Sequence, residues 1–230
     1  MKIGLFTDPH FKSTNGEVRL HKDSLNKIKA VLSIFKGEGC ALAICLGDII
    51  DTEAKHKLEI ENLKAIKGVF DDSGIEIIAL MGNHDGFCFT PEEFYEVLGE
   101  EYRPKTIHCG DKTLIFADAN FFASGKRYAP GDTDWTDTYL PNIEEIRREI
   151  EASLGDCYLF IHQSVDPNIC ESHRIANDEE LRQMLEDTGK VRAVIQGHYH
   201  DGARSEDAGI DYITVSAMCE HELPYFILEI

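Results

Sequence analysis

Five short clusters of carboxylate, amide and imidazole residues occur along this 230-residue chain, and each follows an apolar run. The runs IGLFT, LAICL, IIALM, YLFI and AVIQ have the length and composition of buried β-strands. Because the carboxyl ends of strands in an open α/β sheet carry its chemistry, we expect the clusters to meet in one crevice as a catalytic metal site. In chain order they are Asp8-Pro9-His10, Gly47-Asp48-Ile49-Ile50-Asp51, Gly82-Asn83-His84-Asp85, His162 and Gly197-His198-Tyr199-His200.

The residues beside the candidate ligands favour sharp turns from strand to loop. Pro9 disfavours helix at Asp8, so strand geometry is kept up to that carboxylate. Gly47 permits a tight turn just before Asp48, whose carboxylate can bridge two cations. Mixed imidazole and carboxylate ligands suit Mn, Fe, Zn, Co or Ni better than Ca or Mg. The pattern therefore predicts a transition-metal centre.

The elements that must position these residues alternate between strand and helix, which predicts an α/β fold. Strands are expected at 2–7, 41–46, 75–81, 113–118, 157–161, 191–196, 210–215 and 224–230, the last two suggesting antiparallel pairing. Helices are expected at 20–36, 58–70 and 141–154, after the cap Thr90, and between Asn177 and Gly189. No repeat or linker divides the chain, so we expect a single domain over residues 1–230.

Composition limits the possible partners and the compartment. A net charge of −19 disfavours electrostatic docking on nucleic acid or an anionic membrane. The seven cysteines form no Cys-x-x-Cys pair, and several, including Cys45 and Cys157, lie in apolar runs, as reduced buried thiols do. Met1-Lys2 leads directly into a strand, and no run is long enough to span a membrane. A cytoplasmic location is expected.

The motifs Asp-x-His, Gly-Asp-x-x-Asp, Gly-Asn-His-Asp, a lone His and Gly-His-x-His, in this order over residues 8–200, resemble the calcineurin-like metallophosphoesterases. The resemblance implies a four-layer α/β/β/α sandwich of two mixed sheets flanked by helices. It implies two metals bridged by Asp48. One is held by Asp8, His10, Asp48 and His200, and the other by Asp48, Asn83, His162 and His198. It also implies that His84 faces the substrate phosphate and leaving group, with Asp85 orienting it.

The implied reaction is hydrolysis of a phosphoester or phosphoanhydride bond by a metal-bound hydroxide, which two adjacent cations make available near neutral pH. The segment from Asn177 to Glu220 resembles the branch with manganese-dependent ADP-ribose/CDP-alcohol diphosphatases, and related branches hydrolyse cyclic nucleotides. Many relatives have an Arg where Thr52 stands, and a protein phosphatase would show Arg near Thr52 and Gly86. We therefore expect a phosphodiester or nucleoside diphosphate as substrate.

Several alternatives stay open. Asp51 could support the site from behind the ligands or cap a helix. Segments 119–140 and 163–176 could select substrate or be plain surface loops, and the aromatic residues of the first could stack on a base or pack the loop. The alternatives to a phosphodiesterase are a phosphomonoesterase, a nuclease and a catalytically silent metal-binding scaffold. Five histidines outside the motifs are expected to be surface or packing residues: His21, His56, His108, His173 and His221.

Overall fold

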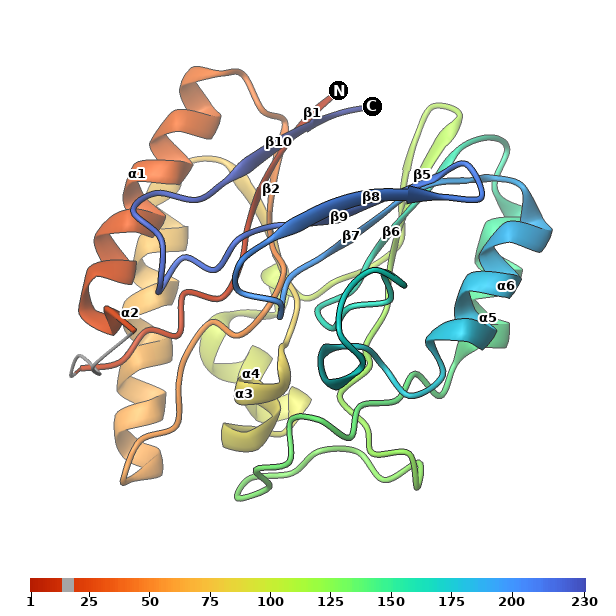
Figure 1. Ribbon diagram of the computed structural model, residues 1–230. Helices are drawn as coiled ribbons and strands as arrows, with labels where there is room; N and C mark the ends of the chain where they lie inside the picture. The colour runs from red at the N-terminus through yellow and green to blue at the C-terminus, as the bar shows by residue number, and fades with distance from the viewer. Residues whose placement is uncertain (14–18) are drawn as a thin grey trace.

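Two β-sheets packed face to face form the centre of the computed structural model, which describes residues 1–13 and 19–230 (Figure 1). The first sheet has the order β10-β1-β2-β3, with β1 (Lys2–Phe6), β2 (Leu42–Cys45), β3 (Glu76–Ala79) and β10 (Phe226–Glu229). The second has the order β4-β5-β6-β7-β9-β8, with β4 (Ile107–Cys109), β5 (Lys112–Phe116), β6 (Cys157–Phe160), β7 (Val191–Gln196), β8 (Ala203–Asp207) and β9 (Ile210–Thr214). Inner strands pair in parallel, whereas β10, β4 and β8 pair antiparallel at the edges.

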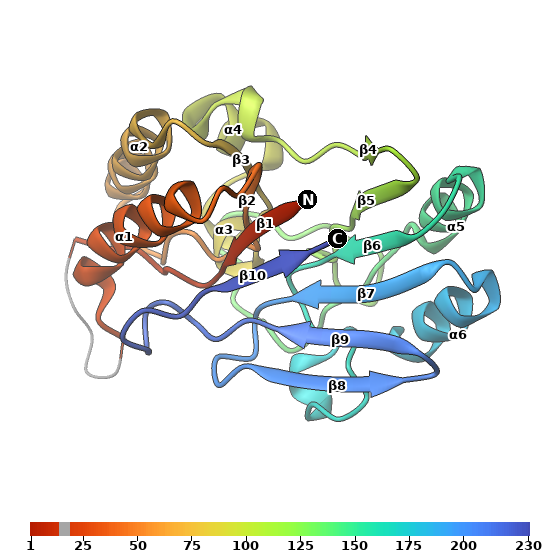
Figure 2. The ribbon, with the colours of Figure 1, turned by 90° about the horizontal axis from the view of Figure 1, so that it is seen from above.

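Helices cover the outer face of each sheet, so the expected four-layer sandwich is confirmed. Figure 1 shows α1 (Ser24–Gly37) and α2 (His56–Ser73) on one side and α5 (Ile143–Ala152) and α6 (Asp178–Thr188) on the other. The short helices α3 (Asn83–Cys88) and α4 (Pro91–Leu98) follow β3. Figure 2 shows the two sheets side by side from above, with the chain termini close together on β1 and β10. No helix within the described ranges has both the length and the apolarity needed to cross a membrane.

Alternation along the strands builds the layers, because successive side chains point to opposite faces. In β2, Leu42 and Ile44 pack between the sheets, whereas Ala43 and Cys45 pack under the helices. In β5, Leu114 faces the central layer and Ile115 faces α5 and α6. A strand buried on both faces must be apolar at every position, and this explains why the strands before the ligand clusters read as continuous apolar runs.

The main differences from expectation lie at the sheet edges. Antiparallel pairing occurs near the C-terminus, but β9 pairs with β8 and β10 pairs with β1, so the two expected partners lie in different sheets. Strand β8 was missed because its sequence ARSED has no apolar run; it is an edge strand with no buried residue. Thr90 caps α4 as expected, and Gly189 ends α6 with φ of 62°. Asn177 occupies the start of α6, but its amide bonds to the backbone of Leu140.

Candidate metal centre

The loops after β1, β2 and β7 hold their candidate ligands in an unusual backbone conformation. Asp8, His10, Asp48 and His198 have φ between 43° and 64°, and within the described ranges Ala208 is the sole other non-glycine residue with positive φ. Left-handed backbone is costly for residues with a Cβ and concentrates at functional sites. The turns therefore store strain at the positions that present these side chains.

Two motif glycines allow the loops after β2 and β3 to touch. A Cβ on Gly82 would overlap the Asp48 carboxylate and backbone nitrogen. A Cβ on Gly47, where φ is 117°, would lie 2.7 Å from the Gly82 nitrogen and 2.8 Å from His162 Nδ1. Glycine at both positions is what brings the Asp48, Asn83 and His162 segments within reach of one another.

Asp48 lies between the two halves of the candidate centre. Its Oδ2 is 3.4 Å from His10 Nε2 and 3.3 Å from His162 Nε2. Its Oδ1 accepts a hydrogen bond from the His84 backbone nitrogen at 2.8 Å. Donor atoms about 2.1 Å from one ion in tetrahedral geometry are roughly 3.4 Å apart, so each Oδ2–Nε2 pair has the spacing of two ligands to one metal.

Asp8 is held in the same way, with one oxygen bonded to protein and one left free. Its Oδ2 accepts hydrogen bonds from Thr7 Oγ1 at 2.6 Å and from the His198 backbone nitrogen at 3.1 Å. Its Oδ1 lies 3.5 Å from Nε2 of both His10 and His200. Asp8 thus joins the loops after β1 and β7 and leaves one oxygen facing two imidazoles.

The donor atoms of the candidate ligands include several buried atoms without a hydrogen-bond partner. They are Asp8 Oδ1, His10 Nε2, Asn83 Oδ1, His162 Nε2 and His198 Nε2. Leaving a buried polar atom unsatisfied costs about 1–3 kcal/mol, more for a charged group. Three of these residues, His10, His162 and His198, belong to groups of ligand atoms that lie within 4.8 Å of one another, notably Asp48 with His162 and His198. The side chains present therefore fit a pair of metal ions.

The imidazoles are oriented by partners on their other nitrogen. His162 Nδ1 donates to the Leu46 carbonyl at 3.0 Å, and His200 Nδ1 donates to Glu220 Oε1 at 2.7 Å. A proton fixed on Nδ1 leaves Nε2 with its lone pair free, which is the tautomer a metal requires. Glu220 comes from the segment after β9 and was not expected at the site.

Charges in the metal-free site are strongly perturbed. Burial opposes protonation of His162, but the Asp48 carboxylate raises its pKa to about 9. His200 reaches about 9 as well, because its bond to Asp8 outweighs the effect of burial on its pKa. Burial and the charge on His84 lower the pKa of His10 to about 4, and burial and the charge on His162 lower that of His198 to about 3. In the metal-free site, protons on His162 and His200 thus supply the positive charge that bound metal ions would supply.

His84 is oriented by a carboxylate other than the one expected. Its Nδ1 donates to Asp51 Oδ1 at 2.9 Å. Asp85, expected to orient His84, instead accepts backbone hydrogen bonds from Ile49 at 3.0 Å, Ile50 at 3.1 Å and Gly82 at 2.9 Å. Asp85 lies in the first turn of α3, and its carboxylate accepts hydrogen bonds from the loop after β2 and from Gly82 and makes none with the imidazole. Asp51 therefore contacts a candidate catalytic ring and does not cap α2, which begins at His56 after Lys55.

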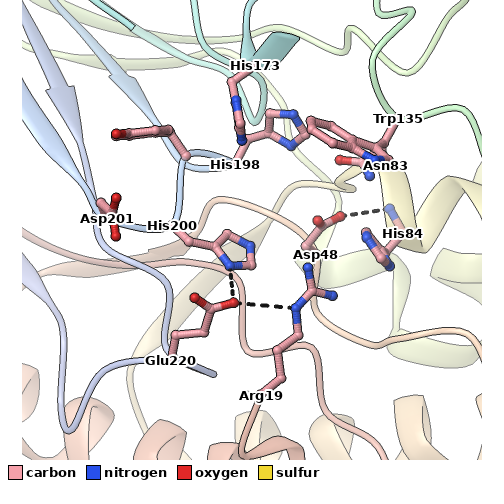
Figure 3. A pocket seen from close by; sticks show the side chains of 11 residues that line it. Arg19, Asp48, Asn83, His84, Trp135, His173, His198, His200, Asp201 and Glu220 are labelled. Atoms are coloured by element: carbon pink, nitrogen blue, oxygen red, sulfur yellow. Dashed lines mark hydrogen bonds and ion pairs between the residues drawn. The ribbon is translucent and has the colours of Figure 1, made fainter. Parts of the chain in front are cut away.

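A cavity of about 350 Å³ opens over these residues and is shown from close by in Figure 3. Its lining brings in side chains that the motifs did not include: Arg19, Trp135, His173, Asp201 and Glu220. Arg19 reaches it from the segment before α1, with Nη1 3.4 Å from Asp51 Oδ2. Cys219, expected as a buried thiol, also lies within ligand range of His10 and His200. No local sequence signal identifies Arg19, Trp135 or Glu220, since segments far apart in the chain deliver them.

The two loop segments each contribute one ring to this cavity. Trp135 comes from 119–140 and His173 from 163–176. Tyr128, in the first segment, packs onto the protein instead: it is buried, and its ring centroid lies 5.0 Å from that of Phe87 and 4.6 Å from that of Phe122. The expectation that His173 is an ordinary surface or packing residue is wrong, because it lines the site. His21 and His221 also touch it, through the backbone carbonyls of His10 and His200.

Comparison with known proteins agrees with this geometry. A sequence model of the family described as calcineurin-like phosphoesterase matches residues 1–202. The chain belongs to this family. This phosphoesterase is 25% identical over 240 residues to a Psychrobacter arcticus protein named "probable cyclic nucleotide phosphodiesterase", with 95% of this chain and 80% of the relative covered. Family membership makes the chain a metal-dependent phosphoric ester hydrolase of a dinuclear type.

Solved structures share the fold of this phosphoesterase. A dimetal phosphatase from Danio rerio superposes with a TM-score of 0.84 at 15% identity, covering 99% of this chain and 91% of the other. Purple acid phosphatase from yellow lupin seeds superposes with a TM-score of 0.61 at 12% identity, covering 93% of this chain and 43% of the other. At these identities the likeness is one of fold.

Proposed function

We propose that this phosphoesterase hydrolyses a phosphodiester or nucleoside-diphosphate-type small molecule at a two-metal centre. The proposed ligands are Asp8, His10, Asp48, Asn83, His162, His198 and His200, with Asp48 bridging. The observation that carries the proposal is the set of buried, unpartnered donor atoms around the Asp48 carboxylate. Several such atoms gathered in one place call for a shared partner, and a metal ion can satisfy all of them at once.

Two cations bound there would neutralise phosphoryl oxygens and lower the pKa of a water molecule. The chain itself supplies a proton donor beside them. Burial would lower the pKa of His84, but the Asp48 charge and the hydrogen bond to Asp51 outweigh it and raise the pKa, which favours the protonated ring. We assign His84 the role of donating that proton to the departing oxygen and Asp51 the role of fixing the ring.

The charge of the cleft favours a diester over a monoester. Arg19 is the one Lys or Arg among the described residues lining the cavity, and Asp201 and Glu220 line it too. A phosphate monoester carries close to two negative charges at neutral pH, whereas a diester carries one. Thr52 stands where many relatives have an Arg that could hold the second charge. The name of the Psychrobacter arcticus relative points in the same direction.

The donor set favours Mn, Fe or Zn as the bound ions, because imidazole and carboxylate together suit these metals. Metal content of protein purified without chelators, measured by mass spectrometry, would test this. Two equivalents of one or two of these metals are expected. A preparation that holds Ca or Mg alone and is active would contradict the assignment.

Hydrolysis by metal-stripped protein reloaded with Mn²⁺ tests the function. Bis-p-nitrophenyl phosphate is compared with p-nitrophenyl phosphate for the wild type and for Asn83→Ala, which removes an uncharged ligand without adding bulk. We expect Mn-dependent turnover that favours the diester and falls at least about 100-fold in the variant. Preference for the monoester would move the assignment to a phosphatase. Two bound metals with no turnover of either compound would favour the scaffold.

A further inference from the structure

Trp135 forms one wall of the active-site cavity. Its ring centroid is 5.1 Å from that of His173 and 5.7 Å from that of His198. His173 in turn contacts Tyr199 at 5.3 Å, so the rings form a continuous aromatic wall beside a proposed metal ligand. Figure 3 shows Trp135 and His173 on one side of the cavity and Arg19 and Glu220 on the other.

Trp135 is unlike the other aromatic residues near it. Trp135 is partly exposed to solvent, with 38% of its surface accessible, whereas Tyr128 in the same segment is 2% exposed. It also lines a second cavity of about 380 Å³, which shares His84 with the first. An indole left open between two cavities that both reach His84 has apolar area available to a ligand.

We propose that Trp135, supported by His173, binds a planar aromatic group of the substrate by stacking, and that this group is a nucleobase. The inference rests on the proposed phosphodiesterase function and narrows it to nucleotide substrates. With the phosphate beside Asp48 and His84, a group joined to it by a sugar would extend toward the Trp135 wall. Stacking is tolerant of base identity, because every base has a π-face, so Trp135 would select for a base without choosing one.

Two carboxylates in the cavity are compatible with such a ligand. Asp201 and Glu220 present carboxylate oxygens in the same cavity, and these can accept hydrogen bonds from sugar hydroxyls. The same carboxylates disfavour a second strongly anionic group at that position. A ligand with one phosphate, a polyhydroxylated linker and a flat apolar end therefore fits the cavity. The phosphate would lie beside Asp48, the hydroxyl groups near the two carboxylates, and the flat end against Trp135.

Trp135 is the one tryptophan of the chain, so its fluorescence reports directly on this wall. The test uses the Mn-loaded protein with adenosine 5′-monophosphate and ribose 5-phosphate, which differ by the base alone. We expect the adenine compound to quench the fluorescence and ribose 5-phosphate to leave it nearly unchanged. By calorimetry, we expect the adenine compound to bind roughly 5- to 150-fold more tightly.

Variants separate stacking from structural support. In Trp135→Ala the affinity ratio between the two compounds should fall close to one, whereas Trp135→Phe should keep much of it. Tyr225→Ala is the matched control, because Tyr225 is 41% exposed but packs on Phe35, away from the cavity. Metal content is measured for every variant, since Trp135 also touches His198.

An unchanged affinity ratio in Trp135→Ala would overturn the inference. So would loss of a metal in that variant, because Trp135 would then act by supporting His198. Two results together would separate the proposals. If the wild type hydrolyses no phosphodiester, and Trp135→Ala lacks the preference for the adenine compound that the wild type shows, base stacking stands and the proposed function fails. Diester hydrolysis without any preference for the base would leave the proposed function and remove this inference.

Discussion

Asp51 accepts a 2.9 Å hydrogen bond from His84, so residues 33 positions apart form one carboxylate–imidazole pair at the mouth of the site. Both belong to motifs found in the sequence, but neither motif shows that they meet. The Asp51 carboxylate holds the His84 ring in place. Burial has the largest effect on the pKa of His84 and lowers it, whereas the Asp48 charge and then the hydrogen bond to Asp51 raise it. This pair leads to the first prediction.

Asp51→Asn should lower kcat about 10- to 100-fold, the usual effect of losing the partner that orients a functional group. Because the carboxylate raises the pKa of His84, its loss should lower that pKa. A protonated His84 would then persist only to a lower pH, so the alkaline limb of the kcat profile should move to lower pH. The profile is measured with an alkyl phosphodiester, whose leaving oxygen needs a proton.

Asp85→Asn is the contrasting variant. Its side chain accepts backbone hydrogen bonds and does not touch the His84 ring, so the variant should lose about 1–3 kcal/mol of unfolding free energy. Urea titration of both variants distinguishes the roles. A shifted pH profile in Asp85→Asn, with none in Asp51→Asn, would restore the assignment that the sequence suggested.

Metal binding should release protons at pH 7. His162 and His200 have pKa values of about 9 in the metal-free protein, so both are protonated there and must become neutral to coordinate. About two protons per protein are expected from these rings, and metal affinity should rise with pH up to about 9. Calorimetry in buffers of different ionisation enthalpy measures the number.

The same groups give the metal-free protein a pH-dependent stability. Their pKa values are raised above the unfolded value, so the stabilisation is complete below about pH 6.5 and is lost as pH rises through about 9.

Asn83→Ala is the control for proton release, because it weakens metal binding without removing a titrating group. Metal binding that releases no protons at pH 7 would contradict both assignments.

Arg19→Ala should weaken binding of inorganic phosphate about 10-fold or more, since a charge-assisted hydrogen bond contributes about 1.5–3 kcal/mol. Arg19 lies 3.4 Å from Asp51 and 3.6 Å from Glu220, so its guanidinium is held at the cavity edge. Arg204→Ala removes an exposed Arg on β8 and serves as control. Equal inhibition constants for phosphate in wild type and Arg19→Ala would exclude the role.

A pH-sensitive link joins α2 to α4 outside the metal centre. His56 contacts Glu59 and Glu93, each at 2.8 Å. The hydrogen bond to Glu93 raises the His56 pKa, burial opposes it, and Glu59 adds to it. The stabilisation is present below the unfolded pKa of about 6.5 and is lost as pH rises through the higher folded value.

His56→Ala should therefore cost about 0.5–1 kcal/mol of unfolding free energy near pH 6 and much less near pH 8.5, because the pair is partly exposed. Urea unfolding of metal-loaded protein measures the difference without interference from the site histidines. Glu93→Gln should reproduce the pH trend. A cost that is the same at both pH values would show that His56 acts by packing alone.

The sequence by itself determined the buried strands and the candidate ligands, and the family resemblance supplied the layers. Strands buried on both faces must be apolar throughout, and a chemical cluster directly after such a run can only lie at a sheet edge. Asp8, Asp48, Asn83 and His198 were therefore identified without coordinates, because type and position along one segment carried the information. The resemblance of the ordered motifs then grouped them.

Tertiary structure alone decided which side chains meet. Asp51 and Asp85 are both acidic and both near His84, and the turn into α3 decides which of them reaches the ring. Arg19, Trp135 and Glu220 converge from segments that carry no motif. Their positions depend on the packing of loops over both sheets, and this long-range geometry leaves no periodic or local trace in the sequence.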